Sequence, residues 1–126
     1  MDAMPTPTPR ELEILKVLWD QGPSSVRHVH RALAAREPDL AYNTVQTLLK
    51  LMEAKELVSH VEEGRAFIYT AQLTRDDTAR RFLDRVFDGM ASSLVSSLLA
   101  GERIPPDELD RIQALIARAR KGKSEG

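Results

Sequence analysis

The chain has 126 residues, a length that fits one compact domain or a small domain with an appendage. It contains no cysteine, which excludes disulfide scaffolds, thiolate metal sites and cysteine catalysis. The net charge of −1 excludes attraction of a polyanion by bulk charge alone. The first residues lack the basic and apolar regions of a secretion signal, and no apolar run approaches the roughly 18 residues that span a bilayer. A soluble cytoplasmic protein is therefore expected.

Two helical patterns follow a flexible lead of residues 1–7. Thr8 as N-cap, Pro9 at the first helical position and Glu11 three residues after the cap predict a helix start, and Gly22-Pro23 predicts its end. The apolar face of this helix contains Leu12, Ile14, Leu15, Leu18 and Trp19. A second helix is predicted to open at Ser24-Ser25, with its apolar face formed by Val26, Val29 and Leu33 and its outer face by Arg27, His28 and Arg31.

Residues 41–55, AYNTVQTLLKLMEAK, carry the most informative pattern in the chain. At about 100° per residue, one apolar stripe contains Val45, Leu48, Leu49 and Met52, and the opposite row contains Asn43, Gln46, Thr47 and Lys50. In the opposite row, the amides can read adenine in a major groove, threonine can bond a base or a phosphate, and lysine can neutralise a phosphate. An ordinary amphipathic helix with a solvated polar face gives the same pattern. Tyr42 could pack under the helix or place its hydroxyl on a phosphate.

Two β-branched and aromatic runs, residues 57–62 and 66–71, flank Glu63-Gly64-Arg65 and predict a β-hairpin. The elements are therefore mainly helical, with one small hairpin, in the order of a winged helix-turn-helix. In that fold the third helix enters the major groove and the hairpin contacts flanking backbone or the minor groove. This order indicates that residues 1–73 form a DNA-binding domain. Arg65 is the predicted contact of the hairpin to phosphate, and pairing with Glu62 or Glu63 is the alternative.

A new helical region is predicted from residue 74 to residue 126, because Thr74-x-x-Asp77 resembles a capping box. Its apolar stripe is interrupted by Gly89 and by residues 101–106, and its basic end from Arg118 is expected to fray. About fifty residues in two or three helices cannot bury such a stripe alone, so we expect a symmetric homodimer on a palindrome. The residues expected at the dimer contact are Phe82, Leu83, Val86, Phe87, Met90, Leu94, Leu98, Ile112, Leu115 and Ile116.

No pattern in the chain predicts a metal site, a cofactor or catalysis. His28 and His30 point about 200° apart on a helix and cannot share a metal ion. His60 lies on a predicted strand with no acidic or imidazole neighbour at ligand spacing. Asp76-Asp77 is a carboxylate pair, but adjacent acids at a helix start suit the helix dipole.

These residues together resemble the BlaI/MecI penicillinase-repressor family of bacterial winged-helix regulators. The resemblance runs from about Thr8 to Ala117, and three motifs carry it, namely residues 11–19 (ELEILKVLW), 42–49 (YNTVQTLL) and 64–69 (GRAFIY). It implies a homodimeric repressor on an operator dyad, with a C-terminal dimerisation region. The residues that it implies in the groove are Asn43, Thr44, Gln46 and Thr47.

The sequence departs from this family in two places. Members that control β-lactam resistance are inactivated by cleavage of an Asn-Phe bond in the C-terminal region, where this chain has Ser97-Leu98. Copper-responsive relatives carry a C-terminal cysteine cluster, which this chain lacks. A sensor-protease is thus a candidate partner, but neither the β-lactam nor the copper signal carries over. The alternative function is a winged-helix protein-interaction module without DNA binding, which the near-neutral charge supports.

Overall fold

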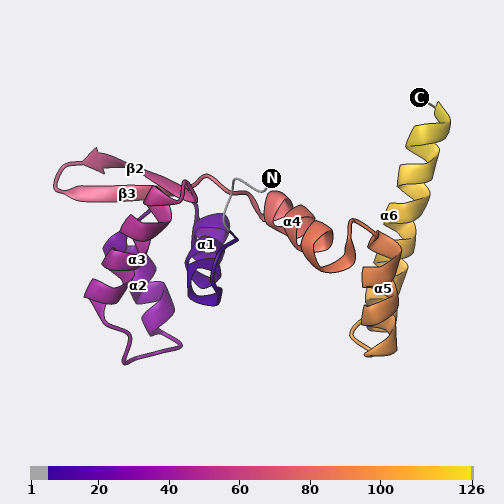
Figure 1. Cartoon of the computed structure of the whole chain (residues 1–126), viewed down its shortest axis with the longest axis horizontal. Helices are drawn as coiled ribbons and strands as arrows, with labels where there is room; N and C mark the ends of the chain where they lie inside the picture. Colours follow the sequence, from indigo (N-terminus) through magenta and orange to yellow (C-terminus); the bar gives the residue numbers. More distant parts are fainter. Residues whose placement is uncertain (1–5, 126) are drawn as a thin grey trace. The chain divides into compact units, whose positions relative to one another are not determined.

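The computed structural model describes residues 6–125, so residues 1–5 of the predicted flexible lead lie outside the described part. In chain order, the elements are α1 (Pro9–Gln21), β1 (Ser24–Ser25), α2 (Val26–Ala34), α3 (Tyr42–Ala54), β2 (Val58–Glu63), β3 (Ala66–Ala71), α4 (Arg75–Phe87), α5 (Ala91–Ala100) and α6 (Pro106–Glu125) (Figure 1). They belong to two compact units, one ending at Arg81 and the other beginning at Phe82. In the described part of the chain, no helix has the length and hydropathy needed to cross a membrane.

Helix α1 begins where the sequence predicts it. The Thr8 hydroxyl oxygen accepts a hydrogen bond from the Glu11 N–H at 3.2 Å, and Glu11 Oε1 accepts one from the Thr8 N–H at 3.0 Å. These two bonds complete a capping box, and Pro9 fits the first turn because it has no N–H to leave unpaired. The helix ends at Gly22, whose φ of 79° favours glycine.

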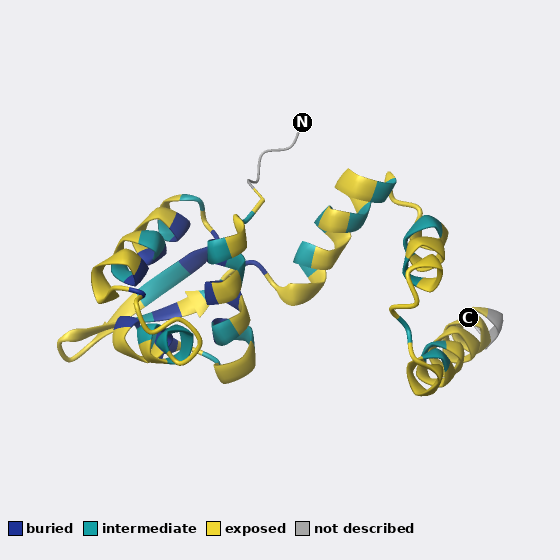
Figure 2. Ribbon diagram, turned by 90° about the horizontal axis from the view of Figure 1, so that it is seen from below, coloured by how far each residue is buried: buried dark blue, intermediate teal, exposed yellow. Residues whose placement is uncertain are grey.

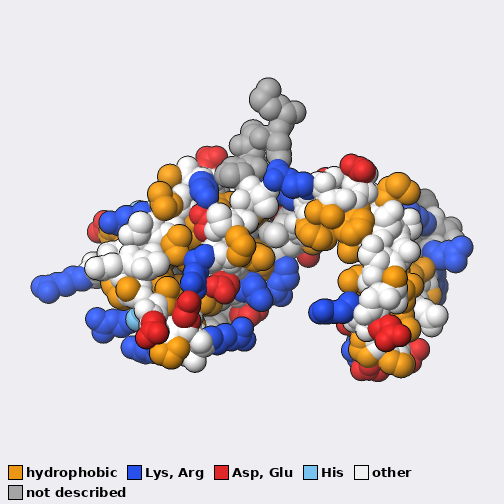
Figure 3. All heavy atoms as spheres, turned by 60° about the horizontal axis from the view of Figure 1, so that its bottom comes forward, with side chains coloured by type: hydrophobic (Ala, Val, Ile, Leu, Met, Phe, Trp, Pro, Cys, Tyr) orange, Lys and Arg blue, Asp and Glu red, His pale blue; other side chains and the backbone are white. Residues whose placement is uncertain are grey.

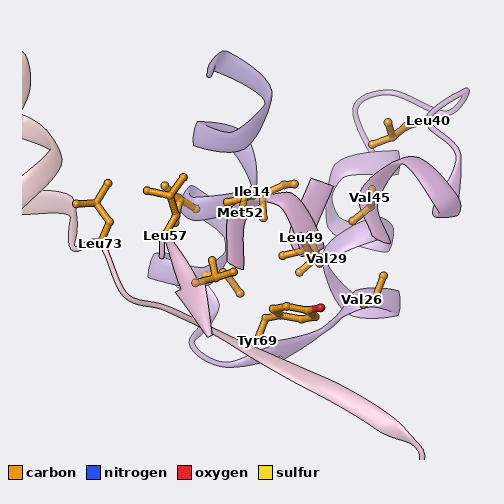
Figure 4. Packing of buried hydrophobic residues seen from close by; sticks show 13 residues of the cluster. Ile14, Val26, Val29, Leu40, Val45, Leu49, Met52, Leu57, Tyr69 and Leu73 are labelled. Carbon is orange, nitrogen blue, oxygen red and sulfur yellow. The ribbon is translucent and has the colours of Figure 1, made fainter. Parts of the chain in front are cut away.

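Helices α1, α2 and α3 contact one another around an aliphatic core, and the sheet lies against them. In Figure 4 the ring of Tyr69 lies close to Leu49 and Val29, and Ile14 lies near Met52. The apolar residues predicted for the three helices face this core, with the exception of Leu12, which is half-buried and lies outside the cluster. The buried core consists of Ile14, Leu15, Leu18, Val26, Val29, Leu40, Val45, Leu49, Met52, Leu57, Val58, Tyr69 and Leu73.

The sheet has three antiparallel strands in the order β1-β3-β2. The predicted hairpin is present, with Glu63 opposite Ala66 beside its tip. Strand β1 was not predicted, because the sequence was expected to open a helix at Ser24-Ser25. Instead these two residues pair with β3, and Ser25 then caps α2 by accepting the His28 N–H at 3.1 Å. The arrangement is a winged helix-turn-helix, as expected.

The segment that follows β3 contacts α1 through the Trp19 side chain. The Trp19 indole N–H donates a hydrogen bond to the Leu73 carbonyl at 2.9 Å. The Arg75 guanidinium lies 5.3 Å from the centre of the Trp19 ring and pairs with Asp20 at 2.8 Å. The first compact unit ends at Arg81, inside α4, and the domain boundary at residue 73 stays a prediction.

The second unit consists of the last part of α4 with α5 and α6. Gly89 has a φ of 79° and separates α4 from α5, at the predicted interruption. Helix α6 continues through Glu125, so the segment from Arg118 that was expected to fray has helical geometry. Lys123 lies in its last turn, where a cation suits the helix dipole. From residue 82 to residue 123 no residue is buried in the single chain (Figure 2).

Candidate nucleic-acid interface

Helix α3 presents a polar face away from the core. Its apolar side is fixed by Val45, Leu49 and Met52, each of which is fully buried. Of the residues predicted to read bases or bind phosphate on this helix, Gln46 is half-buried and the others are exposed, namely Tyr42, Asn43, Thr44, Thr47 and Lys50. Because the buried stripe fixes the rotation of α3, these polar side chains have a defined direction.

A cleft lies between α3 and the hairpin. It brings together four of the predicted site residues, Tyr42, Gln46 and Lys50 from α3 and Arg65 from the hairpin tip. Asn43, Thr44 and Thr47 are exposed on α3 but do not line this cleft. The remaining lining comes from the start of α2 and from the hairpin, and consists of Ser25, Val26, Arg27, Glu63, Ala66, Phe67 and Tyr69.

Arg65 stands at the tip of the hairpin, beside Gly64. Gly64 has a φ of 63°, a left-handed conformation that lets the two strands reverse in a tight turn. Within residues 6–125, Arg65 forms no ion pair with Glu62, Glu63 or any other carboxylate. Its guanidinium is therefore free to bind an external anion, and the alternative pairing considered from the sequence is not formed.

Tyr42 joins the cleft to a second surface on α2. Its ring meets the His30 ring edge-on, with 5.7 Å between the ring centres, and 41% of the residue stays exposed. The His30 Nε2 atom is 2.7 Å from the Leu40 carbonyl, which fixes the imidazole against the turn between α2 and α3. Tyr42 also lies beside Arg27 and Arg31, which stand one turn apart on α2.

Sequence reasoning missed the contribution of α2 to this surface. Ser25 and Arg27 line the cleft, and Arg31 extends it along α2. A signal was present, since Arg27 and Arg31 are spaced four residues apart on the outer face of a predicted helix. That spacing alone does not show that the cations stand beside α3, which is a consequence of how the two helices pack.

The residues predicted for dimerisation form an exposed apolar surface in the single chain. The exposed members are Phe82, Val86, Met90, Leu115 and Ile116, and the half-buried members are Leu83, Phe87, Leu94, Leu98 and Ile112. Phe82 and Phe87 meet edge-on within one helix, with 6.0 Å between their ring centres. Each of the five exposed members is at least half exposed.

The expectation that His60 has no acidic neighbour is wrong. The structure places an acidic neighbour beside it, because Glu53 of α3 lies within hydrogen-bond distance of the His60 ring. This pair does not make a metal site, since in the described part of the chain no three histidine or carboxylate side chains are grouped closely enough to hold an ion.

The sequence model of the penicillinase repressor family matches residues 7–118. A penicillinase repressor from Bacillus licheniformis is 26% identical over an alignment of 129 residues, gaps included. The alignment covers 99% of this chain and 100% of the relative. A transcriptional regulator BlaI from Mycobacterium tuberculosis is 34% identical over 116 residues, which cover 89% of this chain and 83% of the relative.

In structure, the chain is similar to the transcriptional regulator Tm0710 from Thermotoga maritima, with a TM-score of 0.50. The match covers 94% of this chain and 77% of that chain, at 16% sequence identity. At this identity the likeness concerns the fold alone.

Proposed function

Because the chain belongs to the penicillinase repressor family, we propose that it is a transcriptional repressor that binds operator DNA as a homodimer. In each half of a palindromic operator, α3 enters the major groove and the β2–β3 hairpin contacts the flanking backbone. The two relatives described above are a penicillinase repressor and a transcriptional regulator.

The cleft between α3 and the hairpin is the observation that carries this proposal. Its lining contains three cations, Arg27, Lys50 and Arg65, and one acid, Glu63. The chain as a whole has a net charge of −1, so the positive charge at this cleft is a local feature. On the face of the molecule that Figure 3 shows, Lys and Arg side chains are interspersed with carboxylates and apolar side chains.

The residue types on α3 suit the two tasks of a reading helix. Gln46 offers an amide that can bond two adjacent groups on a base edge, and Asn43 offers the same chemistry one turn earlier. Thr44 and Thr47 can bond a base or a phosphate, and Lys50 can neutralise a phosphate. Affinity then depends on few cations, so its salt dependence is expected to be moderate.

Phosphate contacts on both sides of α3 would fix its register in the groove. Arg65 comes from the hairpin tip and Arg27 from α2, and both line the cleft beside α3. Tyr42 lines this cleft and also the surface that Arg27 and Arg31 form on α2. Such contacts position a protein on DNA without reading its sequence.

The exposed apolar surface of the second unit supports the homodimer. Phe82 and Val86 lie four residues apart on α4, Met90 follows the end of that helix, and all three are about half exposed in the single chain. Burying apolar area contributes roughly 25 cal/mol per Å², so a second copy of the same surface would stabilise the pair. A symmetric pair presents two α3 helices to two half-sites, which raises the overall affinity through linkage.

A protein-interaction module is the second candidate function, because the net charge of −1 is low for a DNA-binding protein. Selection of duplexes from a random-sequence library by the full-length protein separates the two. The repressor proposal expects a palindromic consensus whose binding resists scrambled competitor DNA, together with dimer sedimentation. Recovery of no consensus, or equal competition by scrambled DNA, would favour the interaction module.

Release from DNA is proposed not to use cleavage of the Asn-Phe type. Ser97 and Leu98 lie inside α5, where the Ser97 carbonyl accepts the Gly101 N–H at 3.2 Å. A protease that selects an aromatic ring should lose on the order of 1–3 kcal/mol on an aliphatic side chain, and the helix must also unwind locally. Incubation of the dimer with a cognate sensor-protease tests this, and a cut between Ser97 and Leu98 that abolishes DNA binding would refute it.

A further inference from the structure

We propose that His60 and Glu53 position the hairpin against α3 and thereby set the reach of Arg65 toward phosphate. This inference rests on the proposed DNA-binding function. It assigns a role to a histidine and a carboxylate that do not line the cleft themselves. The two residues are positioning residues, since they act on DNA through Arg65.

A short pair of contacts joins the reading helix to the hairpin. The His60 Nδ1 atom lies 2.6 Å from Glu53 Oε1 and 2.8 Å from Glu53 Oε2. Glu53 is in the last turn of α3, and His60 is the third residue of β2. Both side chains are about two-thirds or more shielded from solvent, at 27% and 34% exposure, so the interaction is less screened than a fully exposed pair.

The imidazole is also held by the neighbouring strand. Its ring stacks on Phe67 of β3, with 4.2 Å between ring centres and 17° between ring planes. Tyr69 of β3, which pairs with His60 in the sheet, lies 5.4 Å away. Phe67 and Tyr69 both line the cleft, so His60 connects the end of α3 to the cleft wall.

The phenol of Tyr69 adds no charge beside the His60–Glu53 pair. Burial raises the pKa of its phenol, and the nearby Glu53 carboxylate raises it further. The phenol therefore stays neutral at physiological pH. On the same face of β2, Glu62 is the next residue outward from His60, and it is exposed.

Beyond His60 the hairpin has no further support from the core. Every residue from 61 to 67 is exposed. Gly64 lies four residue steps beyond His60, a distance of about 13 Å at roughly 3.3 Å per residue of extended strand. A rotation of about 10° at His60 would therefore move the tip by about 2 Å, more than a charged hydrogen bond of about 2.8 Å tolerates. The contact between His60 and Glu53 thus decides whether Arg65 reaches a phosphate.

A double-mutant cycle on the full-length protein tests this inference. The probe is the labelled duplex recovered by selection from random-sequence DNA. We expect His60→Ala and Arg65→Ala each to weaken binding about tenfold, and the double variant to bind as Arg65→Ala does, because His60 acts only through Arg65. Hydroxyl-radical footprints of both single variants should lose protection at the flanks and keep it at the centre of each half-site.

Gln72→Ala is the matched control. It removes the 2.7 Å bond from Gln72 Nε2 to Ser59 Oγ, which joins β2 to the segment after β3 without involving α3. Its binding should equal that of the unchanged protein. Glu53→Ala removes both oxygens that contact His60 and supplies the same cycle if His60→Ala lowers the folded fraction in thermal unfolding.

Each outcome decides the question. Additive effects of His60→Ala and Arg65→Ala, or an unchanged affinity of His60→Ala, would overturn the inference. An unchanged affinity of Arg65→Ala would remove the hairpin contact, and the inference with it, while leaving α3 as the reading helix. Failure to recover any duplex would instead count against the proposed function.

Discussion

Replacing Lys55 by methionine should destabilise the protein more than replacing Glu11 by glutamine. Lys55 Nζ lies 3.0 Å and 2.8 Å from the two carboxylate oxygens of Glu11. The Glu11 side chain is 3% exposed, whereas that of Lys55 is 34% exposed. Removal of either partner therefore has a different cost. If Glu11 is removed, the ammonium group of Lys55 can be hydrated, whereas if Lys55 is removed, the buried carboxylate of Glu11 cannot.

The expected magnitudes follow from these contacts. Without Lys55, the buried carboxylate keeps only the hydrogen bond that the Thr8 N–H donates to it, and removing one partner of a buried pair costs about 3–5 kcal/mol. Partial exposure of Lys55 places the expected loss at the lower end, about 3 kcal/mol. Glu11→Gln keeps an oxygen that accepts from Thr8 and Lys55, so a loss of about 1 kcal/mol is expected.

Urea unfolding at neutral pH measures both losses, and the pH dependence gives a second check. Burial acts to raise the pKa of Glu11, but the bonds and charge of Lys55 and the Thr8 bonds outweigh it, so the pKa lies below its ordinary value of 4.5. A lowered folded pKa means that the stabilisation is present above 4.5 and is lost as the pH falls through the folded pKa. Lys55→Met should shrink this acid-side loss. Equal losses for the two variants, or a larger loss for Glu11→Gln, would refute the reasoning.

Other consequences can be measured on stability, sequence preference and assembly. Leu49→Ala should lower the free energy of unfolding by about 2–5 kcal/mol, because it empties a fully buried site; a loss below about 1 kcal/mol in urea unfolding would contradict this. In titrations of the selected duplex, Gln46→Ala should weaken binding by about 1–3 kcal/mol and relax preference at one base pair per half-site, whereas Lys50→Ala should weaken binding to all sequences alike. Unchanged specificity with an intact fold would remove Gln46 from the reading face. A chain ending at Arg81 should stay folded but sediment as a monomer and bind the duplex much more weakly, and sedimentation of the full chain as a monomer at micromolar concentration would contradict the dimer.

Local patterns made much of the fold predictable. The period of Val45, Leu49 and Met52 matches one face of a helix, and the structure buries that face. The Thr8 and Glu11 spacing located the start of α1 because both partners of the capping box lie within one turn. These features depend on residues a few positions apart, which a sequence displays directly.

Features that depend on distant partners were not predictable in the same way. Glu11 is buried because Lys55, 44 residues away, neutralises it. Glu53 and His60 are seven residues apart, but one lies on a helix and the other on a strand, so no single period relates them. Strand β1 is too short to have a pattern of its own, and pairing with β3 defines it.

In the candidate site too, some features follow from local spacing in the sequence and others depend on how distant elements pack. The outward direction of Lys50 and the place of Arg65 beside Gly64 follow from local spacing. The nearness of Arg27 and Ser25 to α3 depends on how α2 packs, so it required the structure.

The sheet order also bears on aggregation through strand edges. Strand β2 lies at one edge of the sheet, and β1 covers only Ile68 and Tyr69 of β3 at the other. Unpaired strand edges are templates on which other chains add strands and aggregate. Glu62 and Glu63 end β2 with adjacent negative charges, and a second copy pairing there would bring like charges together. The acids beside Arg65, which do not favour contact with DNA, thus have a use in discouraging aggregation along this edge.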